Sequence, residues 1–588
     1  MSHCISRLPF LAFICATVFA FPAVALAKDP YARPAGINPT TATLQDVLAK
    51  AKKADGSDTP YRTRVVQGAA NAWGLKGSLR SLQVGDDYRS TLDFGAISWS
   101  NGRVSGQSWR QNPNGLVTLL HDVTGEEDID FEALTRYVSR PSSQSQLLGE
   151  TTGPGAAYVI EARLATGSPM WAFYDKKSLL LTRIEVPFVE ERDVFAFSDF
   201  HKAGPYTDPS QLVISTGVAR NNEEYTLSTL YNVPVSAADV AMPLSNDTLV
   251  QFPAGVNVVS LPLRIANKEG RSQFIDEQSY HSIGQPGDMT QPGYVAHWAA
   301  DPHLITRATI EGHDYDFMLD SGAPGIYVSS DAVAKLGLKS FGPEEQTMTG
   351  NWVRAFALIP KMQIGAITLS NAIAWVLPDW HYRPSTDTDA IGLIGYDFIA
   401  NAALSIDFAK VTLTATNPAL FVPPADAVVV PVILDDGVPN ASMQIGQSTA
   451  NRIVVDTGSA TSVILPRFAD AHPSDVADQG KGREITNTRL ADVDWLSGSY
   501  IQYYNSLGGG LTQLRATELK SVSLSGINLE NWVMLELVAP RGAAEQIGKD
   551  EDGLIGYDFL KYFTVHFDYQ HNQIFLEPNA LAKGTINH

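Results

Sequence analysis

Cysteine is almost absent from this chain of 588 residues: there are only two, Cys4 and Cys15, and both lie within the first 27 residues. A basic residue, a long apolar run and an Ala-Leu-Ala site ending at residue 27 predict that residues 1–27 are a signal peptide, with an uncleaved anchor as the alternative. Removal of this segment leaves no thiol, which excludes disulfides, thiolate metal sites and a cysteine nucleophile. The expected location is periplasmic or secreted.

Basic charge and long apolar runs are also scarce. Lysine and arginine number 43 against 63 aspartates and glutamates, which gives a formal net charge of -20. Such a chain repels nucleic acids and anionic membrane surfaces, so we expect no nucleic-acid partner. No apolar run after residue 27 is long enough to cross a bilayer, so no membrane span is expected once the signal is removed.

Metal-binding patterns are missing as well. The 12 histidines form no His-x-x-x-His pair with an adjacent glutamate, as a helical zinc site requires. The segment Asp387-Thr388-Asp389 lacks the glycine and the distal glutamate of a calcium loop. The sequence therefore predicts neither a metal nor a cofactor.

The chain is rich in strand patterns, which predict a mainly β fold. Residues 28–266 contain short alternating apolar runs separated by Gly, Asn and Asp, and they predict a curved antiparallel sheet. Residues 126–140 carry apolar side chains at helical spacing and predict a helix across that sheet. Residues 267–300 turn to Gly, Pro, Gln and Ser with little periodicity and predict a linker.

An internal repeat follows the linker. Residues 317–323 (FMLDSGA) match residues 453–459 (IVVDTGS), and each copy is followed by the heptad GLIGYDF, at 392–398 and at 553–559. Two motifs in the same order indicate a duplication, with extra residues inserted in the second copy. We therefore predict two lobes, lobe 1 at 301–422 and lobe 2 at 423–588, related by a pseudo-twofold axis.

The repeat delivers two aspartates, Asp320 and Asp456, in equivalent tight turns. Two carboxyls brought together can share one proton and hold a water molecule between them, which is what hydrolysis of an amide requires. Glycine permits the sharp turn, and a hydroxyl can bond to the main chain of the opposite copy. The residues expected to stabilise the two turns are Ser321, Gly322, Thr457 and Gly458.

Each copy also contains a glycine that closes the repeat and a hairpin that carries glycine. Gly395 and Gly556 end short buried strands that we expect to lie across the aspartate turns, where the missing side chain leaves room for the backbone. A mobile hairpin over a substrate needs small residues at its tip. The flap candidates are Gly350 and Trp352 in the first copy and Gly508, Gly509 and Gly510 in the second.

On these motifs, the chain resembles the retropepsin-like aspartic peptidases, with two copies fused as in the pepsin-type bilobal enzymes. The resemblance covers the Asp-Ser/Thr-Gly turns and the two Leu-Ile-Gly strands. It implies that Asp320 and Asp456 are the catalytic pair, under a flap that closes on an extended polypeptide substrate. Pro324 follows the first turn unusually early and the two flaps differ in sequence, which leaves open which flap closes.

The N-terminal region resembles, weakly, the curved half-barrels of lipoprotein carriers. The resembling segments are residues 88–94, the pair 106–109 and 112–115, and the strand 197–200. The resemblance implies at most an apolar concavity for an acyl chain or an extended peptide, so a lipid or lipoprotein is the expected partner of this domain.

Three hypotheses follow. The first is an exported aspartic endopeptidase that hydrolyses peptide bonds through a water activated by the two aspartates, one from each repeat. The alternative is a lipid- or lipoprotein-binding protein that carries inactive peptidase-like lobes. In the third, each repeat pairs with its counterpart in another chain.

Overall fold

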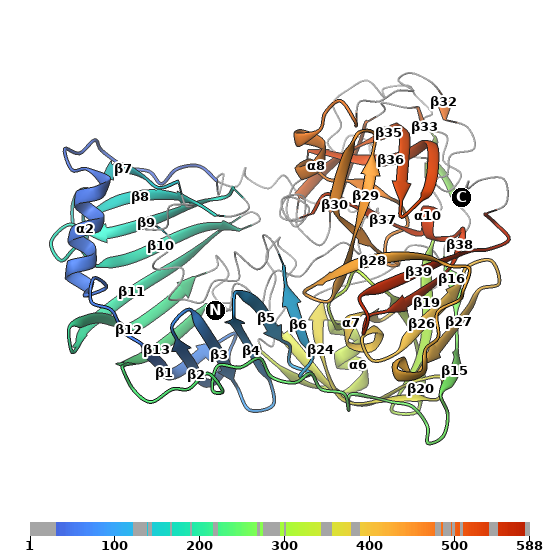
Figure 1. The fold of residues 1–588 in the computed structure, drawn as a ribbon, viewed down its shortest axis with the longest axis horizontal. Coiled ribbons are helices and arrows are strands. Elements are labelled where there is room, and N and C mark those ends of the chain that lie inside the picture. The colour runs from blue at the N-terminus through green and yellow to red at the C-terminus, as the bar shows by residue number, and fades with distance from the viewer. Residues whose placement is uncertain are drawn as a thin grey trace.

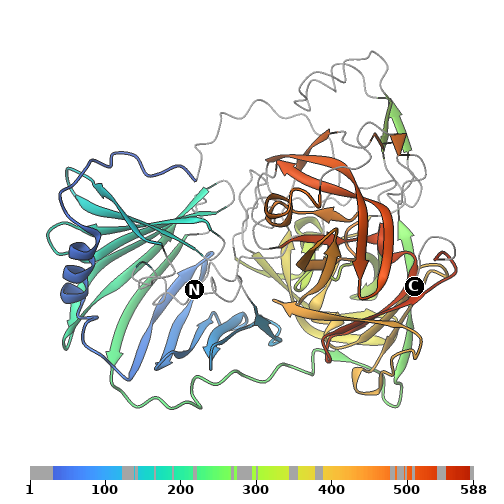
Figure 2. The ribbon, with the colours of Figure 1, turned by 45° about the horizontal axis from the view of Figure 1, so that its top comes forward.

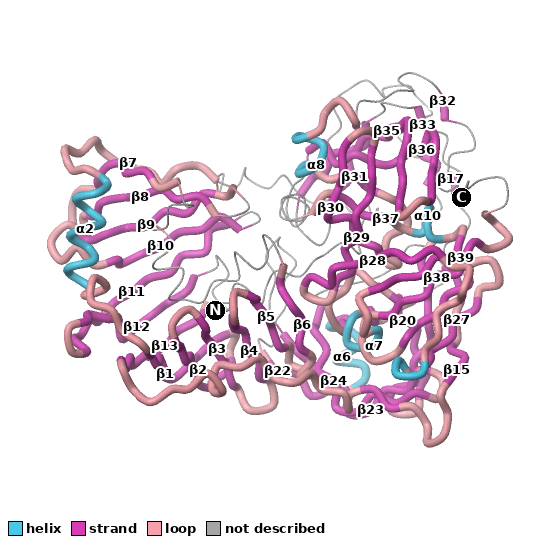
Figure 3. Tube along the Cα trace, viewed as in Figure 1, coloured by secondary structure: helices cyan, strands magenta, loops and turns pink. Residues whose placement is uncertain are grey.

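A computed structural model gives the fold, which is mainly β (Figures 1 and 3). The predicted signal at 1–27 and all but one residue of the predicted helix at 126–140 lie outside the described residues. The structure describes residues 31–121, 138, 144–164, 167–188, 191–215, 222–266, 271–274, 295–298, 302–342, 355–377, 389–476, 484–485, 495–496, 500–505, 510–539 and 551–582.

A curved antiparallel sheet forms the N-terminal part of the molecule, at the left of Figure 1. Its strands are hydrogen-bonded in the order β7-β8-β9-β10-β11-β12-β13-β1-β2-β3-β4-β5-β6. The strands are β1 (Thr63–Ala72), β2 (Leu75–Val84), β3 (Asp87–Asp93), β4 (Ser98–Val104), β5 (Gln107–Gln111), β6 (Val117–Leu120), β7 (Gln146–Glu150), β8 (Ala157–Arg163), β9 (Pro169–Asp175), β10 (Leu181–Phe188), β11 (Glu191–Ala203), β12 (Tyr206–Ser215) and β13 (Glu223–Tyr231).

One helix, α2 (Leu44–Asp55), lies against this sheet and was not predicted. The side chain of Thr43 caps its N-terminus by accepting a hydrogen bond from the main-chain N–H of Asp46. Gly56, at φ 79°, ends it in the left-handed conformation that glycine adopts without strain. Its buried face, formed by Val47 and Ala51, packs into the apolar core of the sheet.

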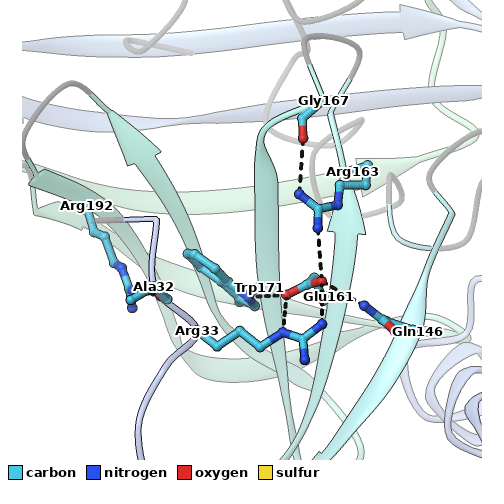
Figure 4. A network of polar contacts seen from close by, with 8 residues as sticks. All are labelled: Ala32, Arg33, Gln146, Glu161, Arg163, Gly167, Trp171 and Arg192. Atoms are coloured by element: carbon cyan, nitrogen blue, oxygen red, sulfur yellow. Dashed lines mark hydrogen bonds and ion pairs between the residues drawn. The ribbon is translucent and has the colours of Figure 1, made fainter. Parts of the chain in front are cut away.

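The chain just before α2 is held on the sheet by a buried carboxylate, Glu161 (Figure 4). Arg33 Nε donates to Glu161 Oε2 at 3.0 Å, and Trp171 Nε1 donates to the same oxygen at 3.0 Å. Gln146 Nε2 donates to Oε1 at 2.7 Å. Burial opposes the ionised form, but these hydrogen bonds outweigh it and keep the pKa of Glu161 below its ordinary value.

Lobe 1 is a second sheet with the order β14-β24-β21-β25-β20-β19-β23-β22, in which β23 also pairs with β24. The short parallel pairing of β20 with β25 lies at its centre. Its elements are β19 (His303–Ile310), β20 (His313–Leu319), β21 (Ile326–Ser329), α6 (Ser330–Leu336), β22 (Lys339–Phe341), β23 (Ala355–Ile364), β24 (Ile367–Leu377), β25 (Gly392–Ile394), α7 (Tyr396–Ile399), β26 (Ala403–Asp407), β27 (Thr412–Thr416) and the 3-10 turn η3 (Pro418–Leu420).

Lobe 2 repeats this arrangement, with β30 parallel to β37 in the place of β20 and β25. Its elements are β28 (Val428–Asp435), β29 (Val438–Ile445), β30 (Ser448–Val455), β31 (Val463–Ile464), α8 (Pro466–Ala471), β32 (Glu484–Ile485), β33 (Trp495–Leu496), β34 (Tyr500–Asn505), β35 (Gly510–Leu524), β36 (Ile527–Ala539), β37 (Gly553–Ile555), α10 (Tyr557–Leu560), β38 (Phe563–Asp568) and β39 (Gln573–Pro578).

The two lobes share one sheet. Its order is β15-β27-β26-β38-β39-β28, so lobe 1 and lobe 2 each contribute a hairpin, and β26 pairs with β38 at the junction. The register places Leu404 opposite Phe567 and Ile406 opposite Val565. All four side chains are buried in one apolar core that contains residues of both lobes. A shared core of this kind holds the lobes as one unit.

The chain enters lobe 1 before residue 267. The strands β14 (Val250–Gln251), β15 (Val258–Leu261) and β16 (Arg264–Ala266) pair with β24, β27 and β19 of lobe 1. Together β15 and β16 occupy the place that β28 occupies in lobe 2, since β28 pairs with β39 and β29. Residues 250–266 were assigned to the N-terminal domain by the sequence, yet their strands pair with lobe 1.

The segment 267–300, predicted as a linker, therefore lies between two strands of lobe 1. In lobe 2 the equivalent connection, from β28 to β29, is the tight turn at Asp436 and Gly437. Within the segment, β17 (Arg271–Phe274) pairs antiparallel with β18 (Val295–Trp298). The views in Figures 1 and 2 show the N-terminal sheet on one side and both lobes on the other.

Candidate active site

Each aspartate follows the last residue of a central strand. β20 ends at Leu319, and the main-chain N–H of Asp320 donates to the carbonyl of Ile394 in β25 at 2.9 Å. In lobe 2 the N–H of Asp456 donates to the carbonyl of Ile555 in β37, also at 2.9 Å. The two repeated motifs therefore meet in space, because the strand of each heptad fixes the start of the aspartate turn in its own lobe.

The residues after the aspartates join the two turns across the lobe boundary. Ser321 Oγ donates to the carbonyl of Val455 at 2.7 Å, and Thr457 Oγ1 donates to the carbonyl of Leu319 at 2.9 Å. The main-chain N–H of Ser321 donates to Thr457 Oγ1 at 3.0 Å, and that of Thr457 donates to Ser321 Oγ at 2.9 Å. Both hydroxyls thus donate and accept, and the exchange is reciprocal.

The carboxyl of each aspartate lies against the glycine of the opposite turn. A Cβ added to Gly458 would lie 2.5 Å from Cγ of Asp320, and one added to Gly322 would lie 2.8 Å from Cγ of Asp456. Within its own turn each carboxyl accepts a hydrogen bond, from Gly322 N–H at 2.8 Å and from Gly458 N–H at 2.7 Å. The two carboxyls therefore face the same boundary, where only glycine leaves room for them.

Burial raises the pKa of both carboxyls. Asp320 and Asp456 are fully buried. Burial is the main cause for each, and for Asp320 the negative charge of Asp456 adds to it. Oδ2 of both residues receives no hydrogen bond from another donor within the described part of the chain. One proton held between the two carboxyls would remove the repulsion between them.

Residues 306–398 match the family model of the aspartyl proteases. This range contains Asp320 and the closing heptad of lobe 1, so an aspartyl protease-like region is established there. No curated protein gave a significant sequence match.

Two solved structures resemble part of the chain. A DUF1329 family protein from Desulfovibrio piger is 18% identical and covers 34% of this chain and 98% of its own, with a TM-score of 0.27. A LolA superfamily protein from Nitrosomonas europaea is 12% identical and covers 34% of this chain and 99% of its own, with a TM-score of 0.27. Likeness at this level carries no argument about function.

The closing glycines lie directly on the aspartate turns. A Cβ at Gly395 would lie 2.1 Å from the carbonyl oxygen of Ala323, and a Cβ at Gly556 would lie 2.6 Å from that of Ser459. Any side chain at these positions would displace the turn, as the sequence led us to expect.

The heptad also buries a second pair of carboxyls, which sequence reasoning missed. Asp397 and Asp558 lie in the first turns of helices α7 and α10, and burial raises the pKa of each to about 6. Ser462 Oγ donates to Asp558 at 2.7 Å. Asp397 instead receives hydrogen bonds from Asn112 and Asn114, which belong to the N-terminal sheet. The signal in the sequence was the identical Tyr-Asp-Phe in both heptads.

A buried histidine lies beside the pair, and it too was not predicted. His303 begins β19, which pairs antiparallel with β20, the strand that leads to Asp320. Its positive charge, when present, lowers the pKa of Asp456 against the stronger effect of burial. The equivalent strand of lobe 2, β29, begins instead at Val438. The charge environment of the two aspartates is therefore not symmetric.

The flap candidates lie mostly beyond the described residues. Gly350, Trp352, Gly508 and Gly509 fall outside them, and Gly510 is the first residue of β35, opposite Asn505 of β34. Their role as flaps stays a prediction.

Metal sites and membrane spans are both absent from the part of the chain that the structure describes. No group of three or more histidine, cysteine, aspartate or glutamate side chains there could hold a metal ion. Among the same residues no helix is both long and apolar enough to cross a membrane.

Proposed function

We propose that the protein is an exported aspartic endopeptidase whose single site takes Asp320 from lobe 1 and Asp456 from lobe 2. The observation that carries the proposal is the reciprocal bonding of Ser321 and Thr457, which holds two buried carboxyls face to face. An isolated structural aspartate would need only its own turn, whereas here each turn is completed by the other lobe.

The chemistry follows from the shared proton, which is a general property of the carboxylate pairs of aspartic proteases. The ionised carboxyl takes a proton from a water molecule held between the pair as the water oxygen attacks the peptide carbonyl. The protonated carboxyl donates a hydrogen bond to the carbonyl oxygen, which becomes tetrahedral. A proton then passes to the leaving nitrogen as the carbon–nitrogen bond breaks.

The substrate class rests on the family match in residues 306–398 together with this site. A polypeptide bound in extended form is the substrate we propose. Binding of a lipid or lipoprotein by the N-terminal sheet, and export through the signal at 1–27, stay predictions from the sequence.

The decisive experiment compares the purified wild-type protein with Asp320→Asn and Asp456→Asn on a broad peptide library between about pH 3 and 8. Both variants should lose cleavage, because each carboxyl has a separate task in one cycle. Asp426→Asn is the matched control, since Asp426 is exposed in the turn before β28. Absence of cleavage by the wild type across the library would favour the binding-protein alternative.

A mixing experiment separates one fused site from pairing between chains. Equal amounts of Asp320→Asn and Asp456→Asn are incubated together and assayed on the best substrate. The mixture should stay inactive, because the bonds between the turns lie within one chain. Recovery of activity in the mixture would instead mean that lobes of different chains form the site.

A further inference from the structure

A hairpin of the N-terminal sheet contacts both lobes and reaches the heptad segment of lobe 1. It consists of β5, β6 and the turn between them, and Figure 1 shows β6 next to the strands of the lobes. Arg110 and Thr118 bond to Asp436 in the β28–β29 turn of lobe 2. The main-chain N–H of Asp436 also donates to the carbonyl of Leu119 at 3.1 Å. The tip of the hairpin enters lobe 1.

At this tip two asparagines hold the carboxylate of Asp397. Asn112 Nδ2 donates to Asp397 Oδ1 at 2.6 Å, and Asn114 Nδ2 donates to Oδ2 at 2.8 Å. Asn114 also pairs with the main chain of Ile373 in β24, accepting from its N–H at 2.7 Å and donating to its carbonyl at 2.9 Å. Asn114 is buried, so the hairpin tip is built into the lobe.

In lobe 2 the equivalent carboxylate, Asp558, receives its hydrogen bonds from residues of the same lobe. Ser462 donates to Asp558 from its hydroxyl at 2.7 Å and from its main-chain N–H. The equivalent residue of lobe 1, at the same distance after its aspartate, is Ile326. Its main-chain N–H donates to Asp397 Oδ2 at 3.1 Å, but its side chain has no hydroxyl. The donor that lobe 1 lacks at this position is supplied by the N-terminal sheet.

Asp397 is coupled to the catalytic turn on both sides. Before it, Tyr396 N–H donates to the carbonyl of Ala323 at 2.9 Å, and the carbonyl of Ile394 accepts from Asp320 N–H at 2.9 Å. After the turn, Ile326 donates to Asp397 itself. A buried carboxylate without enough donors moves toward water or takes up a proton. Either change would shift the backbone that fixes Asp320.

We propose that Asn112 and Asn114 are positioning residues of the aspartate site, supplying to lobe 1 the donors that Ser462 supplies within lobe 2. This inference rests on the proposed peptidase function. It makes the N-terminal sheet a structural part of the site, so that the two lobes without it hold an incompletely fixed Asp320.

The test uses the full chain with Asn114→Leu, which keeps the size of the side chain and removes its hydrogen bonds. We expect kcat to fall by about 10-fold or more with KM changed by less than about 3-fold, as is typical for loss of a hydrogen bond to a charged group. Gln107→Ala is the matched control, because Gln107 bonds only within the same hairpin, and it should retain wild-type kcat. Ser462→Ala removes the equivalent hydroxyl donor to Asp558 in lobe 2, so it should lower kcat in the same way.

A rescue variant distinguishes positioning from general damage. Ile326→Thr places a hydroxyl at the site equivalent to Ser462 while keeping a branched side chain. Added to Asn114→Leu, it should restore a large part of kcat, because Asp397 regains a donor from its own lobe. If Asn114→Leu keeps wild-type kcat, or if the rescue restores nothing, the proposal is wrong.

Hydrogen exchange provides a readout that does not need activity. In Asn114→Leu, amides in 392–399 should exchange faster than in the wild type, while Gln107→Ala should leave them unchanged. If the wild type cleaves no peptide, the peptidase function fails, but this exchange result still decides the role of the asparagines. Unchanged exchange overturns that role. So does global unfolding of both Asn114→Leu and the rescued variant, which would make the hairpin a folding element.

Discussion

Ser321 and Thr457 each donate a hydrogen bond to the strand that carries the other lobe's aspartate. Ser321 Oγ reaches the carbonyl of Val455, and Thr457 Oγ1 reaches the carbonyl of Leu319. The bonds cross from one repeat to the other, so neither turn is complete alone. This arrangement makes the stability of the lobe boundary and the geometry of the site inseparable.

Loss of one hydroxyl should therefore weaken the whole boundary. Thr457→Val keeps the shape of the side chain but leaves the N–H of Ser321 and the carbonyl of Leu319 buried and unpaired. We expect a loss of about 2–4 kcal/mol in the free energy of unfolding of the lobes, measured by scanning calorimetry. Ser442→Ala is the control, since that hydroxyl makes only a long surface contact with Asn451, at 3.4 Å. Equal stability of both variants would contradict the prediction.

A methyl group added at the lobe boundary should disturb the site more than the loss of one hydrogen bond does. In Gly458→Ala the new Cβ would lie 2.5 Å from Cγ of Asp320, so the carboxyls must separate and cleavage should be abolished. Gly85→Ala is the comparison, because Gly85 faces open space at φ 61° and costs only backbone strain, about 1 kcal/mol. Peptidase activity and thermal unfolding are measured together. Wild-type activity in Gly458→Ala would mean that the carboxyls do not need this approach.

The buried carboxyl of Asp558 should make the lobes less stable at neutral than at acidic pH. Its pKa is raised from 3.8 to about 6 in the folded protein, so the folded state binds the proton more tightly. The stabilisation is fully present below about pH 3.8 and is lost as the pH rises through about 6. At about pH 8 the cost is at most about 3 kcal/mol.

The variant Asp558→Asn removes this cost, because its amide oxygen can still accept from Ser462. We expect the variant to gain stability over the wild type at about pH 8 and to gain little at about pH 4, as followed by denaturant unfolding. Asp426→Asn serves as control and should show no such dependence on pH. A gain of the same size at both pH values would mean that Asp558 is not protonated in the fold.

His303 should contribute to the position of the acidic limb of the rate profile. Its charge favours ionisation of Asp456, so His303→Gln should raise the pKa of that carboxyl and move the acidic limb of kcat/KM to higher pH. The exposed His313 provides the control substitution, His313→Gln. For the wild type we expect activity to fall when both carboxyls are ionised. A rate that climbs steadily to about pH 9 would count against a shared proton.

The sequence predicted the parts of the site that depend on short motifs. The repeated Asp-Ser/Thr-Gly turns led to the expected contacts of Ser321 and Thr457 across the boundary, because duplication implies a pseudo-twofold axis and a hydroxyl next to the axis can reach the other copy. The heptads led to the buried strands β25 and β37. Local chemistry and order along the chain were enough for these conclusions.

Contacts between distant segments could not be predicted in this way. Nothing near Asn114 in the sequence indicates a partner 283 positions away, and an Asn-Pro-Asn-Gly segment is typical of an ordinary turn. Helix α2 was missed because it has only two buried side chains, Val47 and Ala51. The strands β15 and β16 were assigned to the wrong side of 267, since strand patterns carry no information on which sheet a strand joins.

The position of residues 267–300 between two strands of lobe 1 has a consequence for processing. A cut in this stretch would separate the polypeptide into two pieces, yet β15 would still be paired with β27 and β16 with β19. The smaller piece would remain attached through these ladders and through the hairpin that holds Asp397. Such a nicked molecule would run as two bands under denaturing conditions and elute as one particle under native ones.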